Sequence, residues 1–438
     1  MPRRKAPPAS VGVALIVKDG AKTLGACLKS IRPYVTQVVV CIDERTTDRT
    51  EAVARRCGAD VIAPVQVSDW HACAVHGRVL AQHFGNARNT SFRHLDPTLD
   101  CWMWVDADDL VFGGEHLAAL CAEVPEEAVG CWLPYRYSTI NNYAQTTTLF
   151  DRERLLRPRV GWRWDYRVHE VVVPLQPDPR WHRDERVQVV HQEGVHKTVP
   201  STTRNQLLLE IDWEEQPGNQ RVAFYLGNGH FAAGRFAEAI HWYETAIDAG
   251  PNPWEVWQSC CYCSIAYLRL GDVAQATHCA FAAIDTIPAY RDGYYRLAEA
   301  YLAASEFTKA IEWAQVGLRK ENPPPWVFVN PLDTRVNVPA LLADAYGQLG
   351  HVTAARRHLE AAHAVAPTEA FAERIRRYAD LEAAGILAQA FVELAPTLPE
   401  EEVLRLYQAL PPLAKALGRT RDVAVPLMLK RREARYAA

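Results

Sequence analysis

The stretch Cys101-Trp102-Met103-Trp104-Val105-Asp106-Ala107-Asp108-Asp109 decides how the first half of the chain folds. An apolar run that ends abruptly in acids predicts a buried strand whose carboxyl end opens into a polar site, where open α/β sheets bind their ligands. On an extended chain, side chains alternate between two faces, so Asp106 and Asp108 point to the same face and Asp109 points to the other. Paired carboxylates suit Mg²⁺ or Mn²⁺. The alternative is a plain turn, since Asp is common in turns.

Apolar segments that predict strands alternate with segments that predict helices before this stretch. The predicted strands are 11–17, 37–42 and 59–63, and the predicted helices are 23–31, 48–57 and 86–95. Alternating strands and helices form parallel sheets with right-handed crossovers, in which the carboxyl ends of the strands meet at one edge. Asp43 and Glu44 follow the second strand. We therefore expect them at the same edge as Asp106 and Asp108.

The length and charge of the chain limit its architecture and its partners. Its 438 residues exceed the about 250–300 at which a single core stops growing, so two or more domains are expected. The whole chain has 48 Lys and Arg and 52 Asp and Glu. Residues 1–204 contain 26 of the basic and 24 of the acidic residues, so the rest of the chain contains 22 basic and 28 acidic residues. Neither part has the basic excess of a general nucleic-acid binder. A local basic groove for nucleic acid remains an alternative.

The cysteines and the lengths of the apolar runs bear on the cellular compartment of the protein. The 11 cysteines form an odd set without regular spacing, and many lie inside apolar runs, which predicts reduced, buried thiols. The group Cys260, Cys261, Cys263, His278 and Cys279 offers zinc ligands, but it follows a helical pattern and lacks the paired spacing of zinc sites. No apolar run approaches the about 20 residues of a membrane span. We expect a soluble cytoplasmic protein.

From Arg221 onward a repeating pattern of small and aromatic residues replaces the short strands. The first copy contains Leu226, Gly227, Gly234, Ala239, Tyr243 and Pro251, and further copies begin at Cys263, Leu297 and Leu342. The spacing predicts two-helix units and resembles the tetratricopeptide repeat, with Ala223 in place of the opening Trp. The proline-rich segment 322–334 is expected as an exposed loop. Stacked helix pairs form an extended surface that suits a macromolecule or a second copy of the chain.

The first half of the chain resembles a family 2 glycosyltransferase of the GT-A fold. The motifs that carry the resemblance are ALIVKDG at 14–20, VVCIDERTTDRT at 39–50, FGNARN at 84–89 and VDADD at 105–109. The resemblance implies an α/β, Rossmann-like, mostly parallel sheet, followed by the all-α repeats. The expected parts are a flexible N-terminus at 1–10, the GT-A domain at 11–205, tetratricopeptide-like repeats at 206–367 and C-terminal helices at 368–438.

The resemblance assigns the polar residues at the predicted edge to a nucleotide-sugar donor. Asp43, with Glu44 beside it, would hold the nucleobase. Arg88 would lie on the nucleotide side, where a guanidinium suits a flat base or a phosphate. In the Asp-x-Asp motif, Asp106 would reach the ribose, and Asp108 would bind a Mn²⁺ or Mg²⁺ cofactor.

A later segment, Gly161–Glu170, resembles the aromatic, His-Glu-ended segment that this group of enzymes places on the acceptor side. Glycosyl transfer needs a base to remove the acceptor proton, and Glu170 is the predicted base, with Asp165 second. The structural alternative for Glu170 is an ion pair with Arg163 or Arg167. The chemistry that the resemblance implies is a single displacement with inversion at the anomeric carbon.

The resemblance also implies a histidine in the metal site. His191 follows a predicted strand at 187–190 and fits this position better than His196, although either is also an ordinary loop residue. Asp109 has no assigned partner, and we expect it only to support the metal ligands.

The function that these expectations imply is metal-dependent, inverting transfer of a sugar from a nucleotide sugar, with a UDP-sugar favoured. The acceptor would be macromolecular, a peptide or protein, a glycan or a nucleic-acid base, and the repeats would hold part of it or pair two copies of the chain. The alternative is a catalytically inactive nucleotide-binding scaffold that acts through its repeats. Acids at the ends of successive strands favour the enzyme, because no structural need gathers so many like charges.

Overall fold

The computed structural model describes residues 8–65, 71–73, 78–80, 83–140, 142–192, 201–327, 332–394, 397–399, 401, 402 and 405. The chain divides into two compact units. The first contains Met1–Arg296 and Lys320–Pro331, and the second contains Leu297–Arg319 and Leu332–Ala438. The predicted N-terminus at 1–10 lies largely outside the described residues, as do most residues after 394. The predicted limits at 205 and 367 stay predictions.

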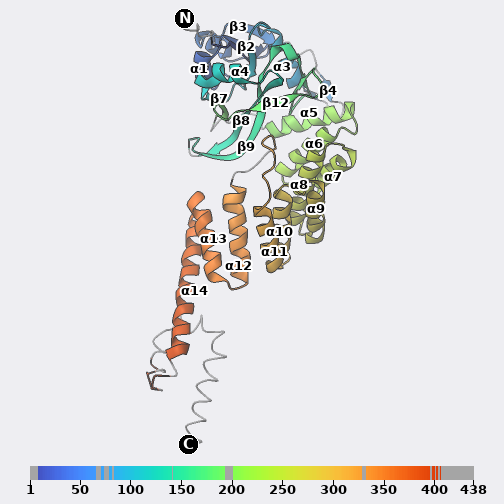
Figure 1. The fold of residues 1–438 in the computed structure, drawn as a ribbon. Helices are drawn as coiled ribbons and strands as arrows, with labels where there is room; N and C mark the ends of the chain where they lie inside the picture. The colour runs from blue at the N-terminus through green and yellow to red at the C-terminus, as the bar shows by residue number, and fades with distance from the viewer. Residues whose placement is uncertain are drawn as a thin grey trace, which may run out of the picture. The chain divides into compact units, whose positions relative to one another are not determined.

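A mixed sheet of nine strands forms the first part of the chain (Figure 1). Its strands are β1 (Val11–Val17), β2 (Gln37–Asp43), β3 (Val61–Val65), β6 (Cys101–Trp104), β7 (Asp109–Phe112), β8 (Ala128–Ile140), β9 (Gln145–Leu156), β12 (Arg180–Arg183) and β13 (Gln188–His191). The order is β3-β2-β1-β6-β9-β8-β13-β7, with β12 paired to β8. Strands β3, β2, β1 and β6 are parallel neighbours, whereas β9 pairs antiparallel with β6 and β8. The predicted strands are present, and the sheet becomes mixed beyond β6.

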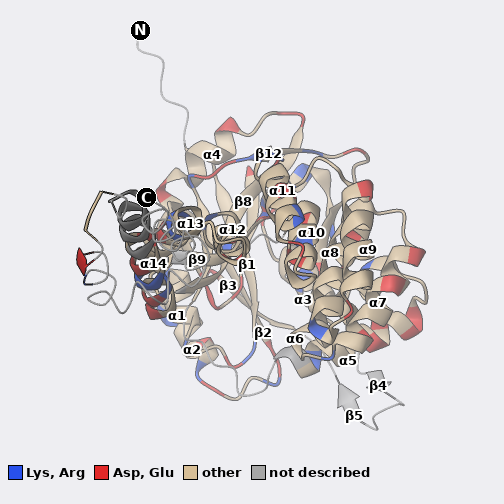
Figure 2. Cartoon of the chain, turned by 90° about the horizontal axis from the view of Figure 1, so that it is seen from below, with Lys and Arg blue, Asp and Glu red and all other residues tan. Residues whose placement is uncertain are grey.

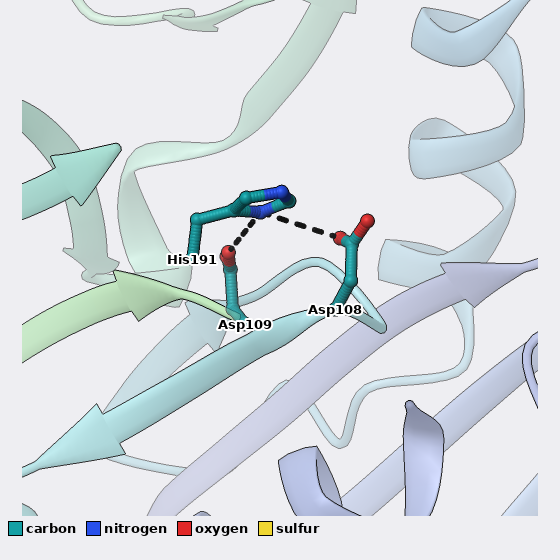
Figure 3. A group of neighbouring side chains, drawn as sticks. All are labelled: Asp108, Asp109 and His191. Atoms are coloured by element: carbon teal, nitrogen blue, oxygen red, sulfur yellow. Dashed lines mark ion pairs between the residues drawn. The ribbon is translucent and has the colours of Figure 1, made fainter. Parts of the chain in front are cut away.

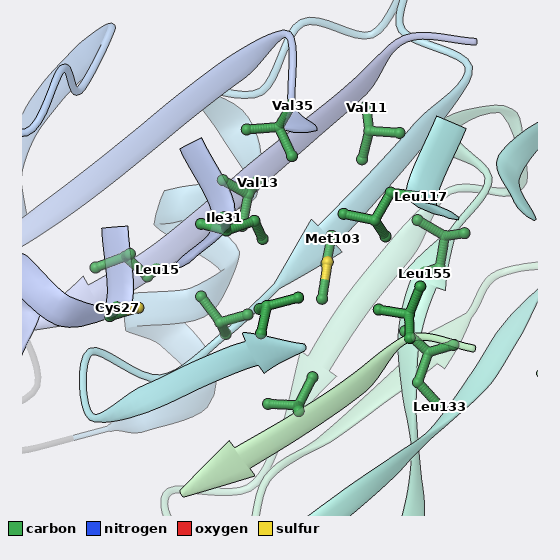
Figure 4. Close-up of a cluster of buried hydrophobic side chains, with 14 of the residues drawn as sticks. Val11, Val13, Leu15, Cys27, Ile31, Val35, Met103, Leu117, Leu133 and Leu155 are labelled. Carbon is green, nitrogen blue, oxygen red and sulfur yellow. The ribbon is translucent and has the colours of Figure 1, made fainter. Parts of the chain in front are cut away.

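Helices cover the sheet and bury apolar residues on both of its faces. They are α1 (Leu24–Ile31), α2 (Thr50–Arg56), α3 (Phe84–Arg93) and α4 (Leu117–Glu123). Because side chains alternate along β1, Val13 and Leu15 enter one buried cluster and Ala14 enters another. The first cluster, drawn in Figure 4, includes Val11, Ile31, Met103, Leu117 and Leu155. Burial on two faces explains the continuous apolar runs of β1 and β2.

One prediction about the cysteines is wrong. Cys101 on β6 and Cys121 on α4 form a disulfide. The two residues are 20 apart in the chain and meet only because α4 packs on the sheet, so no local spacing announces the pair. Free cysteines that are buried as predicted are Cys27, Cys41, Cys131, Cys260, Cys261 and Cys263, whereas Cys57 and Cys279 are half-buried. Burial raises the pKa of the Cys41 thiol to about 12.

Helices that pack as pairs continue the first unit. They are α5 (Ser201–Glu215), α6 (Gln220–Ala232), α7 (Phe236–Ala249), α8 (Pro253–Leu270) and α9 (Val273–Thr286). Small residues let the paired helices approach closely. A Cβ added at Gly227 of α6 would lie 2.6 Å from the Tyr243 ring of α7. Cys260 and Cys263 are buried core residues of α8, in line with the structural interpretation of the cysteine group.

The second unit is also helical. It contains α11 (Phe307–Leu318), the π-helix at Asp333–Asn337, α12 (Val338–Gln348), α13 (Val352–Val365) and α14 (Glu369–Leu394), and α10 (Asp292–Ala303) spans the division between the units. Within the described residues, no helix combines the length and hydropathy needed to cross a membrane.

The proline-rich segment that joins the third and fourth repeats is less exposed than predicted. Pro323, Pro324 and Val327 are buried, and Val327 joins the apolar cluster around Trp257. The backbone N–H of Asp151 on β9 donates to the carbonyl of Pro325 (2.5 Å). Pro323, Pro324 and Val327 therefore pack within the first unit, whereas Asn322 and Trp326 are exposed as expected.

Candidate functional site

A tight turn after β6 separates the three acids of the opening stretch. The backbone N–H of Asp106 donates to the Asp109 carboxylate (3.0 Å), and the N–H of Asp109 donates to the Asp106 carbonyl (3.0 Å). The chain is therefore not extended between Asp106 and Asp108, and the prediction that these two side chains share one direction is wrong. Asp106 binds Arg88, whereas Asp108 and Asp109 both lie beside His191.

Asp108, Asp109 and His191 form the one group among the described residues whose donor atoms could hold a metal ion. Figure 3 shows both carboxylates directed at the imidazole. The Nδ1 of His191 lies 3.8 Å from Asp108 Oδ1 and 3.6 Å from Asp109 Oδ1. Strand β13 sets this distance because it pairs antiparallel with β7 and places His191 opposite Asp109. The structure thus brings together Asp108 and His191 as predicted, and their role as metal ligands stays a prediction.

Asp109 is held by the protein itself. Its side chain is fully buried and accepts hydrogen bonds from the Tyr135 hydroxyl (2.9 Å) and from Arg154 (3.3 Å). Burial and the neighbouring Asp106 carboxylate raise its pKa, although Arg154 opposes the rise. Asp109 therefore anchors the turn and lies beside His191, and its expected role in supporting metal ligands stays a prediction.

Arg88 of α3 joins the turn after β6 to the predicted catalytic segment. Its buried guanidinium donates to Asp106 (2.5 Å) and to Glu170 (2.6 Å), and it lies 4.6 Å from the ring of Trp104. Burial alone would raise the pKa of Asp106, but the charge of Arg88, followed by that of Arg154, lowers it well below the ordinary value. The three side chains form a chain of alternating charge around the buried Arg88, which we call the Arg88 triad: Arg88, Asp106 and Glu170.

Glu170 pairs with Arg88 and not with the two arginines proposed for its structural alternative. Arg163 pairs with Asp165 (2.7 Å), and Arg167 pairs with Asp212 (2.6 Å). Burial alone would raise the pKa of Glu170, but the charge of Arg88 lowers it below the ordinary value. Glu170 is thus a weak base while it binds Arg88. Asp165, the second predicted base, lies on β10 (Trp162–Asp165) and is more exposed.

The acids after β2 differ in exposure. Asp43 is buried and accepts hydrogen bonds from the Arg45 side chain (2.8 and 2.5 Å) and backbone (2.9 Å). Burial alone would raise the pKa of Asp43, but these hydrogen bonds lower it. Glu44 is exposed. A nucleobase that binds Asp43, as predicted, would have to share this carboxylate with Arg45. The predicted role of His196 lies outside the described residues.

The sequence interpretation missed several charged and aromatic residues around the site. Arg154 of β9 is fully buried between Asp109 and the Trp104 ring, which lies 3.6 Å from its guanidinium carbon. Arg152 donates to the carbonyl of Glu170 (3.3 Å). The Tyr137 ring stacks on His191 at 5.7 Å. The signal was present in the run Asp-Arg-Glu-Arg at 151–154, where four consecutive charged residues lie between apolar pairs of one strand. Of these, Asp151, Glu153 and Arg154 are buried.

Helix α5 brings a further positive charge toward the site. Arg204 lies 4.8 Å from the ring of Phe84, at the start of α3. Burial lowers the pKa of Arg204, and the charges of Glu170 and Asp108 oppose that shift. The helix that follows the sheet therefore contributes to the electrostatics of its edge.

Comparisons with known proteins confirm the helical repeats. Residues 220–253 and 264–324 each match a family model described as a tetratricopeptide repeat. The Hsp70-Hsp90 organizing protein 3 of Arabidopsis thaliana is 30% identical over 95 residues, which are 22% of this chain and 16% of that protein. The chain thus spans well under a fifth of the length of this curated relative.

Solved structures of repeat proteins are also similar to part of the chain. A tetratricopeptide repeat protein of Thermus thermophilus is 20% identical, with a TM-score of 0.32, over 41% of this chain and 89% of that one. MamA from Desulfovibrio magneticus RS-1 is 15% identical, with a TM-score of 0.32, over 38% of this chain and 85% of that one. The resemblance of residues 11–204 to glycosyltransferases stays a prediction.

Proposed function

We propose that residues 11–204 form a metal-dependent, inverting glycosyltransferase domain that takes a sugar from a nucleotide sugar, with a UDP-sugar favoured. The observation that carries the proposal is the group of Asp108 and Asp109, at the start of β7, and His191, at the end of β13, whose donor atoms lie within 4.8 Å of one another. The order of the sequence motifs around this group supports the same assignment. The donor and metal specificity follow from the resemblance.

Asp108 and His191 fit a divalent cation. Carboxylate oxygens suit Mg²⁺ and Mn²⁺, and Asp109 already accepts hydrogen bonds from Tyr135 and Arg154. Asp108 and His191 would therefore hold the cation, while Asp109 orients the imidazole, as carboxylates do behind metal-bound histidines. When bound, the cation would stabilise the negative charge of the departing diphosphate.

The Arg88 triad would change partners when a donor binds. Asp106 would accept a hydrogen bond from the ribose, and Arg88 would turn toward the nucleotide, whose phosphates suit a guanidinium. Glu170 would then lose the ion pair that lowers its pKa, and its basicity would rise. A stronger carboxylate base is what removal of the acceptor proton requires, so donor binding would prepare Glu170 for the acceptor.

The helical repeats support a macromolecular acceptor or a protein partner. Stacked helix pairs form extended binding surfaces. On α7 the charged residues are Glu238, Glu244 and Asp248, and the helix has no Lys or Arg (Figure 2). An acidic helix is unfavourable for a nucleic-acid phosphate backbone, so a peptide, protein or glycan acceptor is favoured over a nucleic-acid base.

The second candidate function is a repeat scaffold whose sheet domain is catalytically inactive. The matches to tetratricopeptide repeat models favour this candidate directly, whereas the enzyme rests on the geometry of the site and on the resemblance. A scaffold would depend on the surfaces of α6–α9 and would not need Asp108 or His191.

Turnover with a panel of nucleotide sugars separates the two candidates. The protein is incubated with Mn²⁺, each donor and a mixture of peptides and glycans, and the products are identified by mass spectrometry. Asp108→Ala is expected to abolish sugar transfer with the fold retained, and Glu127→Ala, at an exposed position outside the site and the repeats, is the matched control. No transfer by the unmodified protein with any donor, or equal transfer by Asp108→Ala, would support the scaffold.

A further inference from the structure

The turn that carries Glu170 is strained and is held from outside its own hairpin. Strands β10 (Trp162–Asp165) and β11 (Val171–Pro174) pair antiparallel, and residues 166–170 join them. Tyr166 and His169 adopt positive φ angles of 70° and 52°. Such angles are unfavourable for bulky side chains and persist only where the surrounding structure imposes them.

Helix α5 binds Arg167, the second residue of this turn, through ion pairs and a backbone hydrogen bond. The buried Arg167 guanidinium pairs with Asp212 (2.6 Å) and with Glu215 (2.7 and 2.8 Å), and its backbone N–H donates to Asp212 (3.2 Å). Side-chain and backbone contacts to one helix fix both the position and the orientation of the residue. We call this set the Arg167 clamp: Arg167, Asp212 and Glu215.

Helix α6, which lies in the first repeat, contacts His169, the residue before Glu170. The ring of His169 stacks on Tyr225 at 4.1 Å and 9°, and Arg221 donates to the His169 carbonyl (3.0 Å). Arg221 and Tyr225 are four residues apart and lie on one face of α6. The repeat therefore touches the residue adjacent to the predicted base.

Helix α3 contacts the other side of the same turn. The N–H groups of Phe84 and Gly85, at the start of α3, donate to the carbonyls of Arg167 (2.9 Å) and Tyr166 (3.2 Å). A Cβ at Gly85 would lie 2.6 Å from the Tyr166 carbonyl oxygen, so the approach requires glycine. One turn further along, α3 carries Arg88, the partner of Glu170. The turn is thus fixed between α3 and the helices α5 and α6.

We propose that Arg167 is a positioning residue through which α5 holds Glu170 against Arg88, while the first repeat holds the adjacent His169. The inference rests on the proposed function for its catalytic consequence, while the clamp itself is independent of any activity. The repeats are then part of the catalytic architecture, because loosening α5 or α6 displaces the turn that carries the base. A scaffold that merely followed an independent enzyme domain would not need these contacts.

Two variants of the full chain test the clamp. The single variant is Glu215→Gln, and the double variant combines Asp212→Asn with Glu215→Gln. Glu214→Gln, an exposed position on the same helix, is the matched control. Hydrogen exchange of residues 162–174 is expected to accelerate about tenfold or more in the double variant, because charge-assisted hydrogen bonds are lost. Exchange in β1 and β2 should stay unchanged, which shows that the sheet remains folded. Because Glu215 is partly exposed, its single variant gives a smaller effect if the double variant does not fold.

Turnover then tests the positioning role. The clamp variants should lower kcat about tenfold or more and leave the KM for the nucleotide sugar within about twofold, and Glu214→Gln should change neither. Unchanged exchange at 162–174, or faster exchange with an unchanged kcat, overturns the proposal. If the unmodified protein transfers no sugar from any donor, the proposed function fails, and the exchange measurement alone decides whether the clamp exists.

Discussion

The turn after β6 and the helix pair α6–α7 are stabilised in opposite ways. Around the turn, opposite charges alternate, and Asp106 and Asp109 each pair with an arginine that comes from another element. Between α6 and α7, small residues such as Ala223 and Ala239 are buried and aromatic rings fill the space between them. The turn is held by a few strong, mutually dependent interactions, and the helix pair by many weak ones.

The largest expected effect comes from removing the buried arginine of the turn. Arg154→Met should destabilise the protein by about 3–5 kcal/mol, because it leaves the buried Asp109 without its charge partner. Urea unfolding measures the loss, and Arg159→Met, at an exposed position that follows β9, should stay within about 0.5 kcal/mol. If both variants lose the same stability, Arg154 is not the residue that holds the turn.

The helix pair should respond to a change of size instead of charge. Gly227→Ala is expected to cost about 1–3 kcal/mol, because the added methyl group would meet the Tyr243 ring and overpack the interface. Tyr243→Leu should relieve the clash, so that Gly227→Ala costs less in that background. A double-mutant cycle by thermal or urea unfolding measures the coupling. Additive effects would show that the two residues do not limit how closely the helices approach.

The difference between the two regions also explains how far the sequence alone could go. The repeats can be predicted from the sequence because small residues allow close packing within each helix pair. The same pattern of small residues therefore recurs along the chain. The strands and the acids after them are visible for the same local reason. The partners of those acids are not, since Arg88 and Glu170 are 82 residues apart and Cys101 meets Cys121 only after α4 has packed. The tight turn at 106–109 likewise depends on Tyr135 and Arg154.

Acid should weaken the turn before the helix pair. The folded-state pKa of Asp106 is lowered, so its pair with Arg88 contributes stability above the unfolded pKa of about 3.9 and loses it as the pH falls through the folded pKa. A loss on the order of 1–2 kcal/mol between about pH 5 and pH 3 is expected. Asp106→Asn should remove this part of the slope when unfolding is measured across that range. An unchanged slope in the variant would mean that other carboxylates account for it.

The smallest effect is expected at an exposed ion pair of ordinary geometry. Glu51 and Arg55 pair on the surface of α2 at 2.6 Å, and solvent screens such pairs strongly. Arg55→Ala should therefore change the unfolding free energy by less than about 0.5 kcal/mol. A loss comparable with that of Arg154→Met would mean that burial is not what separates strong from weak charge pairs in this protein.

Calorimetric titration with UDP in the presence and absence of Mn²⁺ tests the proposed site most directly. The account predicts that UDP binds to the unmodified protein only with Mn²⁺, and that Asp108→Asn or His191→Ala loses this metal-dependent binding while Asp248→Ala keeps it. UDP binding that is equal with and without Mn²⁺, or that survives in Asp108→Asn and His191→Ala, would contradict the assignment of these residues to a metal site. Absent binding of both UDP and GDP would contradict the nucleotide-sugar site as a whole.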